Sequence, residues 1–490
     1  MLPLLAVIMP FVVGLGVSLL DRAPNVRDGL SFVGSVVTFG IVASMLPDVL
    51  AGNTPTSTLF EILPGVELTL RADAMGMVFA FLAAFLWMGA SVYAVGYMRG
   101  ENAKHQTRFF VFYAWCLSTA FGLAFSGDLL TFFIFYELLT IATYPLVTHK
   151  GDDKARAAGR TYLMFLLPGG AALLAALALA YATTGDVTFT AGGFLGDAMS
   201  PAMIWLMCAL FLAAFGTKSG IMPLHPWLPA AMVAPTPVSA LLHAVAVVKA
   251  GVFGFARAIG FVIGPETLSD VGANYVLATL AAITIVVASV IALRQDALKR
   301  RLAFSTIAHL SYIVLGLSLF AAEAFDGALL HIFNHGLAKI TLFMVAGAIY
   351  VHRHFDKVSE LNGIGRTMPW TMGAWAIASL SLAGLPPMGG LLSKWYLVAG
   401  GFAAGDYLFA AVMVVGGLLT ASYLFPVFYA AFFKPAPDPA EAKKYGEASP
   451  AMVVPLCITA AAVVLMGLGD LIGIQELAAS VAAAVMGGAP

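Results

Sequence analysis

Apolar stretches of about 20 residues recur along the whole chain, and a helix needs roughly 20 apolar residues to cross the hydrocarbon core of a bilayer. Hydropathy predicts such helices from one end of the sequence to the other, and no stretch between them is long enough for a soluble domain. The fold class predicted from the sequence is therefore an all-α integral membrane protein with about 14 transmembrane helices. The predicted spans are residues 2–20, 29–50, 74–96, 109–127, 129–148, 161–183, 201–229, 236–262, 272–293, 303–320, 326–349, 371–403, 405–433 and 450–472.

Composition supports a membrane protein and excludes several other classes. Of the 490 residues, 61% are hydrophobic and only 10% are charged, which rules out an ordinary water-soluble globule. The formal net charge of −1 gives no reason to expect a nucleic-acid partner. The three cysteines lie in apolar spans without the spacing of a zinc or disulfide motif. A short extended segment is predicted in the long linker before residue 74, where the residues alternate.

The basic residues predict the orientation of the chain. Most of the 25 Lys and Arg residues lie in loops that follow odd-numbered spans, whereas the loops after even-numbered spans hold almost none. Because cytoplasmic loops are rich in Lys and Arg, we expect both termini on the non-cytoplasmic side of an inner (plasma) membrane.

A few basic and acidic residues lie inside apolar spans. A charged side chain at the bilayer centre costs about 2.5–3.5 kcal/mol on insertion scales, so a set of them needs a reason. A lysine could instead extend its amine to the interface, and a buried carboxyl could simply stay protonated. Burial disfavours the charged form of either group, which suits both to carry protons. The residues concerned are Glu137, Lys218, Lys249, Lys339 and Lys394.

Histidines join these groups in one predicted helix. His331, His335 and Lys339 are spaced at i, i+4 and i+8, so they share one helix face and could relay protons. A metal site is the weaker interpretation, because no carboxylate or cysteine accompanies the pair at ligand spacing. We expect neither a metal nor a cofactor. His243 lies in another span, and for His309 a packing role is as good an interpretation as a relay.

Prolines and glycines predict two broken helices, each next to a buried lysine. Three prolines follow Lys218 between residues 223 and 229, and the run GLPPMGG (384–390) precedes Lys394. Each break follows the start of a five-helix unit at nearly the same distance, which predicts two inverted repeats, helices 4–8 and 9–13. The expected regions are 1–108 (helices 1–3), 109–262 and 272–433 (the repeats) and 450–490 (helix 14 and the tail).

Five motifs resemble one membrane-protein family. The sequence is similar to the antiporter-like subunits shared by respiratory complex I, membrane-bound hydrogenases and Mrp-type multisubunit sodium/proton antiporters. The resemblance implies a fourteen-helix core with two inverted five-helix repeats and with helices 7 and 12 broken. The motifs are MPLHPWLPAAMVAPTPVSALLHAVAVVKAG (222–251), FYELLTIATYPLV (135–147), DALKRRLAFSTIAHLSY (296–312), HIFNHGLAKITLFM (331–344) and LAGLPPMGGLLSKW (382–395).

The resemblance also implies roles for individual residues. It assigns Glu137 as the essential glutamate of helix 5, Lys218 as its partner lysine on helix 7 and Lys249 as the central lysine of helix 8. The further members of the implied proton path are His243, His331, His335, Lys339 and Lys394. A lysine at position 394 argues against the member of complex I that has glutamate there. The length of the chain most resembles the D subunit of an Mrp-type antiporter.

We therefore expect a subunit that moves protons along these groups and exchanges them for sodium or another monovalent cation. The alternative is a non-redox, proton-pumping subunit of a complex I-type NADH dehydrogenase or a membrane-bound hydrogenase. In both cases the expected partners are other membrane subunits of a hetero-oligomeric complex, within the lipid bilayer. Two further classes fit the sequence less well. A membrane enzyme with a histidine-based site would need a nucleophile–base or metal constellation that the sequence lacks, and an inert scaffold would leave the buried lysines unexplained.

Overall fold

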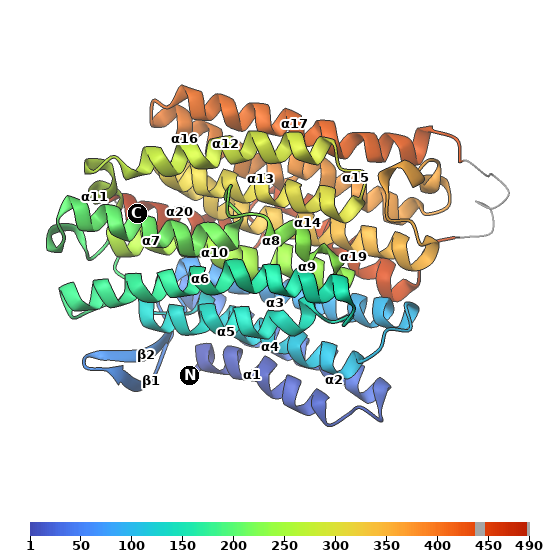
Figure 1. Ribbon diagram of the computed structural model, residues 1–490, viewed down its shortest axis with the longest axis horizontal. Helices are drawn as coiled ribbons and strands as arrows, with labels where there is room; N and C mark the ends of the chain where they lie inside the picture. The colour runs from blue at the N-terminus through green and yellow to red at the C-terminus, as the bar shows by residue number, and fades with distance from the viewer. Residues whose placement is uncertain (437–445, 488–490) are drawn as a thin grey trace.

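The chain folds into a bundle of long helices that lie roughly parallel to one another (Figure 1). A computed structural model describes residues 1–436 and 446–487. The long helices of the first part are α1 (Leu2–Ser18), α2 (Pro24–Leu50), α3 (Ala74–Gly100), α4 (Gln106–Ala124), α5 (Leu129–Val147), α6 (Asp153–Thr184) and α7 (Pro201–Ser219). Those of the second part are α12 (Ala273–Leu293), α13 (Leu298–Ser318), α14 (Ala322–Arg353), α15 (Pro369–Ala383), α16 (Gly389–Ala403), α17 (Tyr407–Phe433), α19 (Pro450–Leu468) and α20 (Ile474–Met486).

Short elements connect the two parts. The connecting elements are α8 (Trp227–Ala230), η2 (Ala231–Val233), α9 (Thr236–Ala244), α10 (Val247–Arg257), η3 (Ala258–Ile263) and α11 (Pro265–Asp270). Within the first part, η1 (Gly196–Ala198) lies between α6 and α7, and within the second part, η4 (Val358–Glu360) and η5 (Ile364–Arg366) lie between α14 and α15. In the described residues, 12 helical segments are long and apolar enough to cross a membrane, and Leu2–Ser18 and Ile474–Met486 are shorter apolar helices. The prediction of an all-α, multi-pass membrane protein is confirmed.

Both predicted helix breaks are present. The helix α7 ends at Ser219, and Gly220 follows it with a left-handed φ of 73°, a conformation that glycine adopts at little cost. In the same way, α15 ends at Ala383 and is followed by Gly384 with a φ of 86°, and α16 begins five residues after Gly384. A third interruption, between α9 and α10, was not predicted. There Val245 and Ala246 leave the helical conformation, and η3 continues α10 as a π-helix.

Two other elements lie outside the predicted spans. The linker before α3 forms an antiparallel hairpin of β1 (Thr56–Leu63) and β2 (Val66–Arg71), which confirms the extended segment expected there. The hairpin projects from one end of the bundle (Figure 1). The sequence after residue 473 was predicted only as a tail, but it forms α20. This helix buries one face, including Leu477 and Val481, and packs against α14 and α3.

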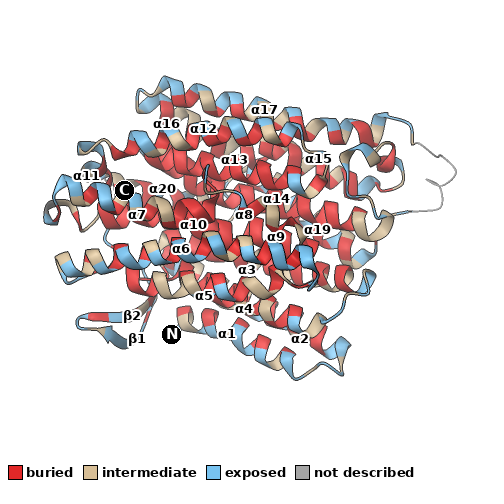
Figure 2. Ribbon diagram, in the orientation of Figure 1, coloured by how far each residue is buried: buried red, intermediate tan, exposed pale blue. Residues whose placement is uncertain are grey.

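The centre of the bundle is formed by α13, α14 and the interrupted helix of α9 and α10. Their most apolar windows are completely buried, whereas those of the peripheral helices α2, α6 and α17 are less than half buried. Figure 2 shows this gradient, with buried residues concentrated on the inner helices. Polar side chains on α13, α14, α9 and α10 therefore contact protein rather than lipid. This burial is what allows ionisable groups to lie at the depth of the hydrocarbon.

Candidate functional site

Lys218 lies in the last turn of α7, directly before the break, and its side chain is fully buried. Its Nζ donates a hydrogen bond of 2.6 Å to the carbonyl oxygen of Tyr136 on α5 and lies 3.3 Å from the centroid of the Tyr136 ring. The ring face carries negative charge density, so it stabilises an ammonium group here. On the other side, Gly251 of α10 packs so closely against the backbone at Ser219 that there is no room for a side chain.

Glu137 lies next to Tyr136 on α5 and is half-buried. Its carboxylate packs against Gly170 of α6, and the Oε1 atom has no hydrogen-bond partner among the described residues. Among the described residues, no ion pair within 4.0 Å includes Glu137 or Lys218. The two groups that the sequence pairs are thus neighbours through Tyr136, and no direct ion pair joins them.

Lys249 of α10 contacts α14. Its Nζ donates to the carbonyl oxygen of Ile332 at 2.8 Å and lies 2.9 Å from Nδ1 of His335. Both side chains are fully buried. A protonated amine would donate to a bare Nδ1, and a neutral amine could accept a hydrogen from Nδ1, so the contact accommodates one shared proton in either place. This arrangement suits a transfer between the two groups.

Three histidines gather between α13 and α14. Nδ1 of His309 lies 3.1 Å from Nε2 of His331, and the ring of His335 is centred 5.5 Å from that of His309. Two ring nitrogens at hydrogen-bond distance require one hydrogen between them, so this contact contains a proton that can be bonded to either ring. Nδ1 of His331 continues the chain to the Ser393 hydroxyl of α16 at 2.9 Å.

A line of hydroxyl groups connects Lys339 to the same cluster. Nζ of Lys339 donates to the Ser305 hydroxyl at 2.6 Å, and Ser305 lies 2.8 Å from the hydroxyl of Tyr423 on α17. Tyr423 in turn donates to Thr420 at 3.2 Å, and the Thr420 hydroxyl is 3.4 Å from Nε2 of His309. Hydroxyl groups both donate and accept. The Thr420 hydroxyl donates to the Gly416 carbonyl oxygen at 2.8 Å, so passing a proton from lysine to histidine requires this hydroxyl to rotate toward the His309 ring.

Lys394 lies in α16, shortly after the second break, and is 7% exposed. Its Nζ is 4.8 Å from the centroid of the Tyr312 ring and has no hydrogen-bond partner within residues 1–436 and 446–487. The Tyr312 ring stacks on His309 at 5.5 Å. Lys394 therefore borders the histidine cluster without a hydrogen bond to it.

His243 stands apart from these contacts. Its ring stacks on Phe343 of α14 with centroids 4.6 Å apart, and neither ring nitrogen has a partner in the described part of the chain. The structure thus brings Lys249, Lys339 and the three histidines together, places Lys394 at their edge and leaves His243 outside.

Several members of the network were not found from the sequence. The sequence supports two equal interpretations of His309 and carries no signal that marks Ser393, Thr420 or Tyr423. The spacing of Ser305 and His309 at i and i+4 on α13 was the one local signal available. In the described residues, no group of three or more His, Cys, Asp or Glu side chains could hold a metal ion.

Comparison with known proteins agrees with this architecture. The family model described as "NADH:quinone oxidoreductase/Mrp antiporter, TM" matches residues 126–420. The chain is 34% identical over 485 residues to NADH-quinone oxidoreductase subunit N of Desulforudis audaxviator, and the match covers 95% of each protein. It is 30% identical over 500 residues to Na(+)/H(+) antiporter subunit A1 of Staphylococcus aureus, covering 95% of this chain but only 60% of that protein.

A solved structure shows the same fold. A chain of the Mrp complex from Dietzia sp. DQ12-45-1b matches with a TM-score of 0.88 at 21% identity, over 99% of this chain and 98% of that one. The family predicted from the sequence motifs is confirmed. The chain belongs to the NADH:quinone oxidoreductase/Mrp antiporter transmembrane family.

Proposed function

We propose that this chain is the proton-translocating subunit of a multisubunit membrane complex of the Mrp type, which exchanges protons for sodium or another monovalent cation. One observation carries the proposal: a continuous set of hydrogen bonds links Lys339 to Ser393 through Ser305, Tyr423, Thr420, His309 and His331, all buried inside the bundle. Chains of ionisable groups inside a membrane mark proton pathways.

The proposed path runs from Glu137 to Lys218, then to Lys249, His335 and the rest of the histidine cluster. From there it reaches Lys339 and Lys394, with His243 in a supporting role. Close contact between α7 and α10 at Gly251 supports the step from Lys218 to Lys249. The Lys249–His335 contact supports the next step. Between groups that share no hydrogen bond, the path requires water.

Neighbouring membrane subunits complete the site at its Glu137 end. Glu137 is only half-buried, and the adjacent Leu138 and Ile141 are exposed. A carboxylate that faced lipid at this depth would be costly, so we assign this face of α5 to contact with a sister subunit. The peripheral helices would meet other subunits or the lipid bilayer.

The regions and the orientation of the chain are also part of the proposal. Residues 1–108 precede two inverted repeats, 109–262 and 272–433, and helix 14 with the tail occupies 450–490. The paired breaks after α7 and α15 support the repeat. The basic loops lie on the cytoplasmic side of the plasma membrane, and both termini lie on the other side.

A redox-driven complex is the second candidate. Subunit N of an NADH-quinone oxidoreductase matches this chain over nearly the full length of both proteins. The match to the longer A1 subunit of the antiporter covers only 60% of that subunit. In such a complex the chain would use the same path, and electron transfer in other subunits would drive it. Inverted membrane vesicles distinguish the two: sodium would collapse a preformed proton gradient in the antiporter, whereas an electron donor would build one in the redox complex.

The test of the path is Glu137→Gln in the assembled complex. The substitution keeps the shape of the side chain but removes the exchangeable proton, so proton flux should fall to background while the complex still assembles. Glu266→Gln is the matched control, because Glu266 is an exposed glutamate on α11, away from the network. Normal flux in Glu137→Gln would remove Glu137 from the path.

A further inference from the structure

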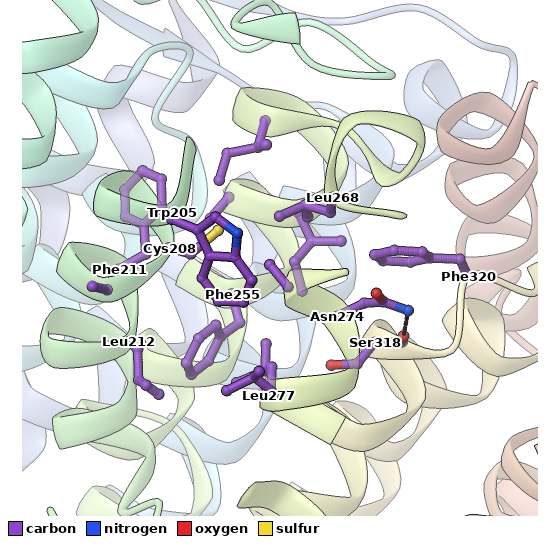
Figure 3. Close-up of a pocket in the computed structure, with 16 residues that line it drawn as sticks. Trp205, Cys208, Phe211, Leu212, Phe255, Leu268, Asn274, Leu277, Ser318 and Phe320 are labelled. Carbon is purple, nitrogen blue, oxygen red and sulfur yellow. Dashed lines mark hydrogen bonds between the residues drawn. The ribbon is translucent and has the colours of Figure 1, made fainter. Parts of the chain in front are cut away.

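An apolar cavity of about 210 Å³ lies between α7, α10 with η3, α12 and the end of α13 (Figure 3). Its walls are almost entirely hydrocarbon and aromatic, and none of the proposed proton-path residues lines it. An engineered cavity of about 150 Å³ with similar walls binds benzene, so this space is large enough for a small organic molecule. The lining includes Trp205, Cys208, Phe255, Asn274 and Leu277.

One polar atom interrupts these apolar walls. The side chain of Asn274, at the start of α12, is 9% exposed, and its amide nitrogen reaches the Ser318 carbonyl oxygen at 3.5 Å. The amide oxygen has no hydrogen-bond partner among the described residues. Figure 3 shows this oxygen on the side of the amide that faces the apolar side chains. A buried acceptor without a donor costs free energy, so the site favours a ligand that supplies one.

The cavity opens near one end of the helices rather than at their centre. Trp205 on its rim is 41% exposed, and Tyr275, next to Asn274 in the sequence, is 55% exposed. Exposed tryptophan and tyrosine side chains are typical of the level where hydrocarbon meets the headgroups. A molecule dissolved in the bilayer with its polar group near the interface could therefore enter with that group at the depth of Asn274.

We propose that this cavity binds a small bilayer-dissolved amphiphile that donates a hydrogen bond, through a hydroxyl or amine group, to the amide oxygen of Asn274. The apolar body would hold about six to eight carbon atoms, in keeping with the size of the cavity. Phe211 of α7 lines the same space and lies seven residues before Lys218, on the same helix face. An occupant would therefore brace α7 against α10 and α12.

Photolabelling of the full-length protein in lipid nanodiscs tests the proposal without any transport assay. The probe is n-octanol with a diazirine on its chain, and the comparison probe is the matching diazirine-bearing n-octane at equal membrane concentration. We expect adducts of the alcohol on Cys208, Phe255 or Leu277, exceeding those of the alkane by roughly five- to tenfold, the effect of one added hydrogen bond. Asn274→Leu should reduce labelling by the alcohol to the level of the alkane.

Two controls keep the result interpretable. Asn53→Leu changes an exposed asparagine outside this cavity and should leave labelling unchanged. Ala209→Trp, at the rim, should abolish labelling of the lining by both probes. Equal labelling by alcohol and alkane, insensitive to Asn274→Leu, would overturn the proposal and show a groove for hydrocarbon tails alone. The proposal would also be overturned if no adducts formed on the lining residues. It would be overturned as well if adducts on these residues persisted in the Ala209→Trp variant.

Discussion

Neutralising Asp73 should strongly destabilise the fold, because it would leave Arg257 as an unpaired buried charge. The two side chains form a bidentate ion pair, with Nη1 to Oδ2 at 2.6 Å and Nη2 to Oδ1 at 2.8 Å. Arg257 is 1% exposed, and its guanidinium carbon lies 5.0–5.1 Å from the centroids of the Phe189, Phe253 and Phe261 rings. Those rings shield the guanidinium group from water. Asp73 is the only carboxylate that pairs with Arg257 in the described residues.

The expected loss of stability differs for the two residues, because Arg257 is fully buried and Asp73 is partly exposed. Breaking a buried pair by removing one partner costs about 3–5 kcal/mol, so Asp73→Asn should lower the free energy of unfolding by about that amount. The substitution keeps an oxygen that can accept the α3 cap from the Gly76 amide, so loss of the cap does not explain the effect. Arg257→Met removes the buried charge itself and leaves Asp73, 15% exposed, with water and Gly76. Its cost should be smaller, about 1–2 kcal/mol.

A double-mutant cycle measures this asymmetry. Denaturant unfolding of the purified protein would give the four free energies, and the double mutant should be close to Arg257→Met alone. Burial by itself would raise the pKa of the Asp73 carboxyl, but Arg257 and the Gly76 amide lower it overall. The pair's stabilisation should therefore persist at neutral pH and be lost only as pH falls through that lowered pKa. Additive single mutants, or Asp73→Asn within about 1 kcal/mol of the wild type, would refute the reasoning.

Two other expectations concern the proton network and the loop after α5. Ser305→Ala removes the hydroxyl that receives the Lys339 amine and should reduce proton flux at least about tenfold. Ser311→Ala on the same helix is the control, because that hydroxyl bonds only its own helix, and equal losses in both variants would contradict the relay. Burial, followed by the charge of Arg108, lowers the pKa of His149 from 6.5 to about 4. Stability should therefore fall as pH drops from about 6.5 to about 4, because only the unfolded chain binds the proton there. His149→Gln should flatten that part of the curve of unfolding free energy against pH. An unchanged curve would show that His149 is not the cause of the loss of stability.

Most of the fold was predictable because its signals are local. Each apolar stretch is by itself enough to predict a transmembrane helix. The two predicted breaks contain prolines and glycines, which favour the end of a helix through their own backbone geometry. The break between α9 and α10 was missed because the sequence LLHAVAVVKA, from residue 241 to 250, contains neither residue. α20 was missed because small apolar residues such as Ala478 and Ala482 give a weak signal until another surface covers them.

The site was predictable only in part, for a different reason. Lysine, glutamate and histidine in an apolar span stand out because they are costly there, so Lys249, Lys339 and the histidines of α14 could be named as candidates from the sequence. Serine, threonine and tyrosine cost little free energy in a transmembrane helix, so their presence in an apolar span does not indicate a functional site. Ser305 and Tyr423 are 118 positions apart in the sequence, and only the packing of α13 against α17 makes them neighbours.

Three of the buried lysines each have a main-chain carbonyl oxygen, a neutral group, among their hydrogen-bond partners. The Nζ atoms of Lys218, Lys249 and Lys339 each donate to a main-chain carbonyl of a neighbouring helix, at 2.6, 2.8 and 3.3 Å. None of the three takes part in an ion pair within the described residues. A buried carboxylate in contact would stabilise the charged amine so strongly that releasing its proton would be slow. A carbonyl oxygen accepts a hydrogen bond from the charged and the neutral amine alike, so it fixes the position of the nitrogen while the proton comes and goes. On the proposed proton path each of these lysines would gain and lose a proton, and a partner of constant charge permits both states.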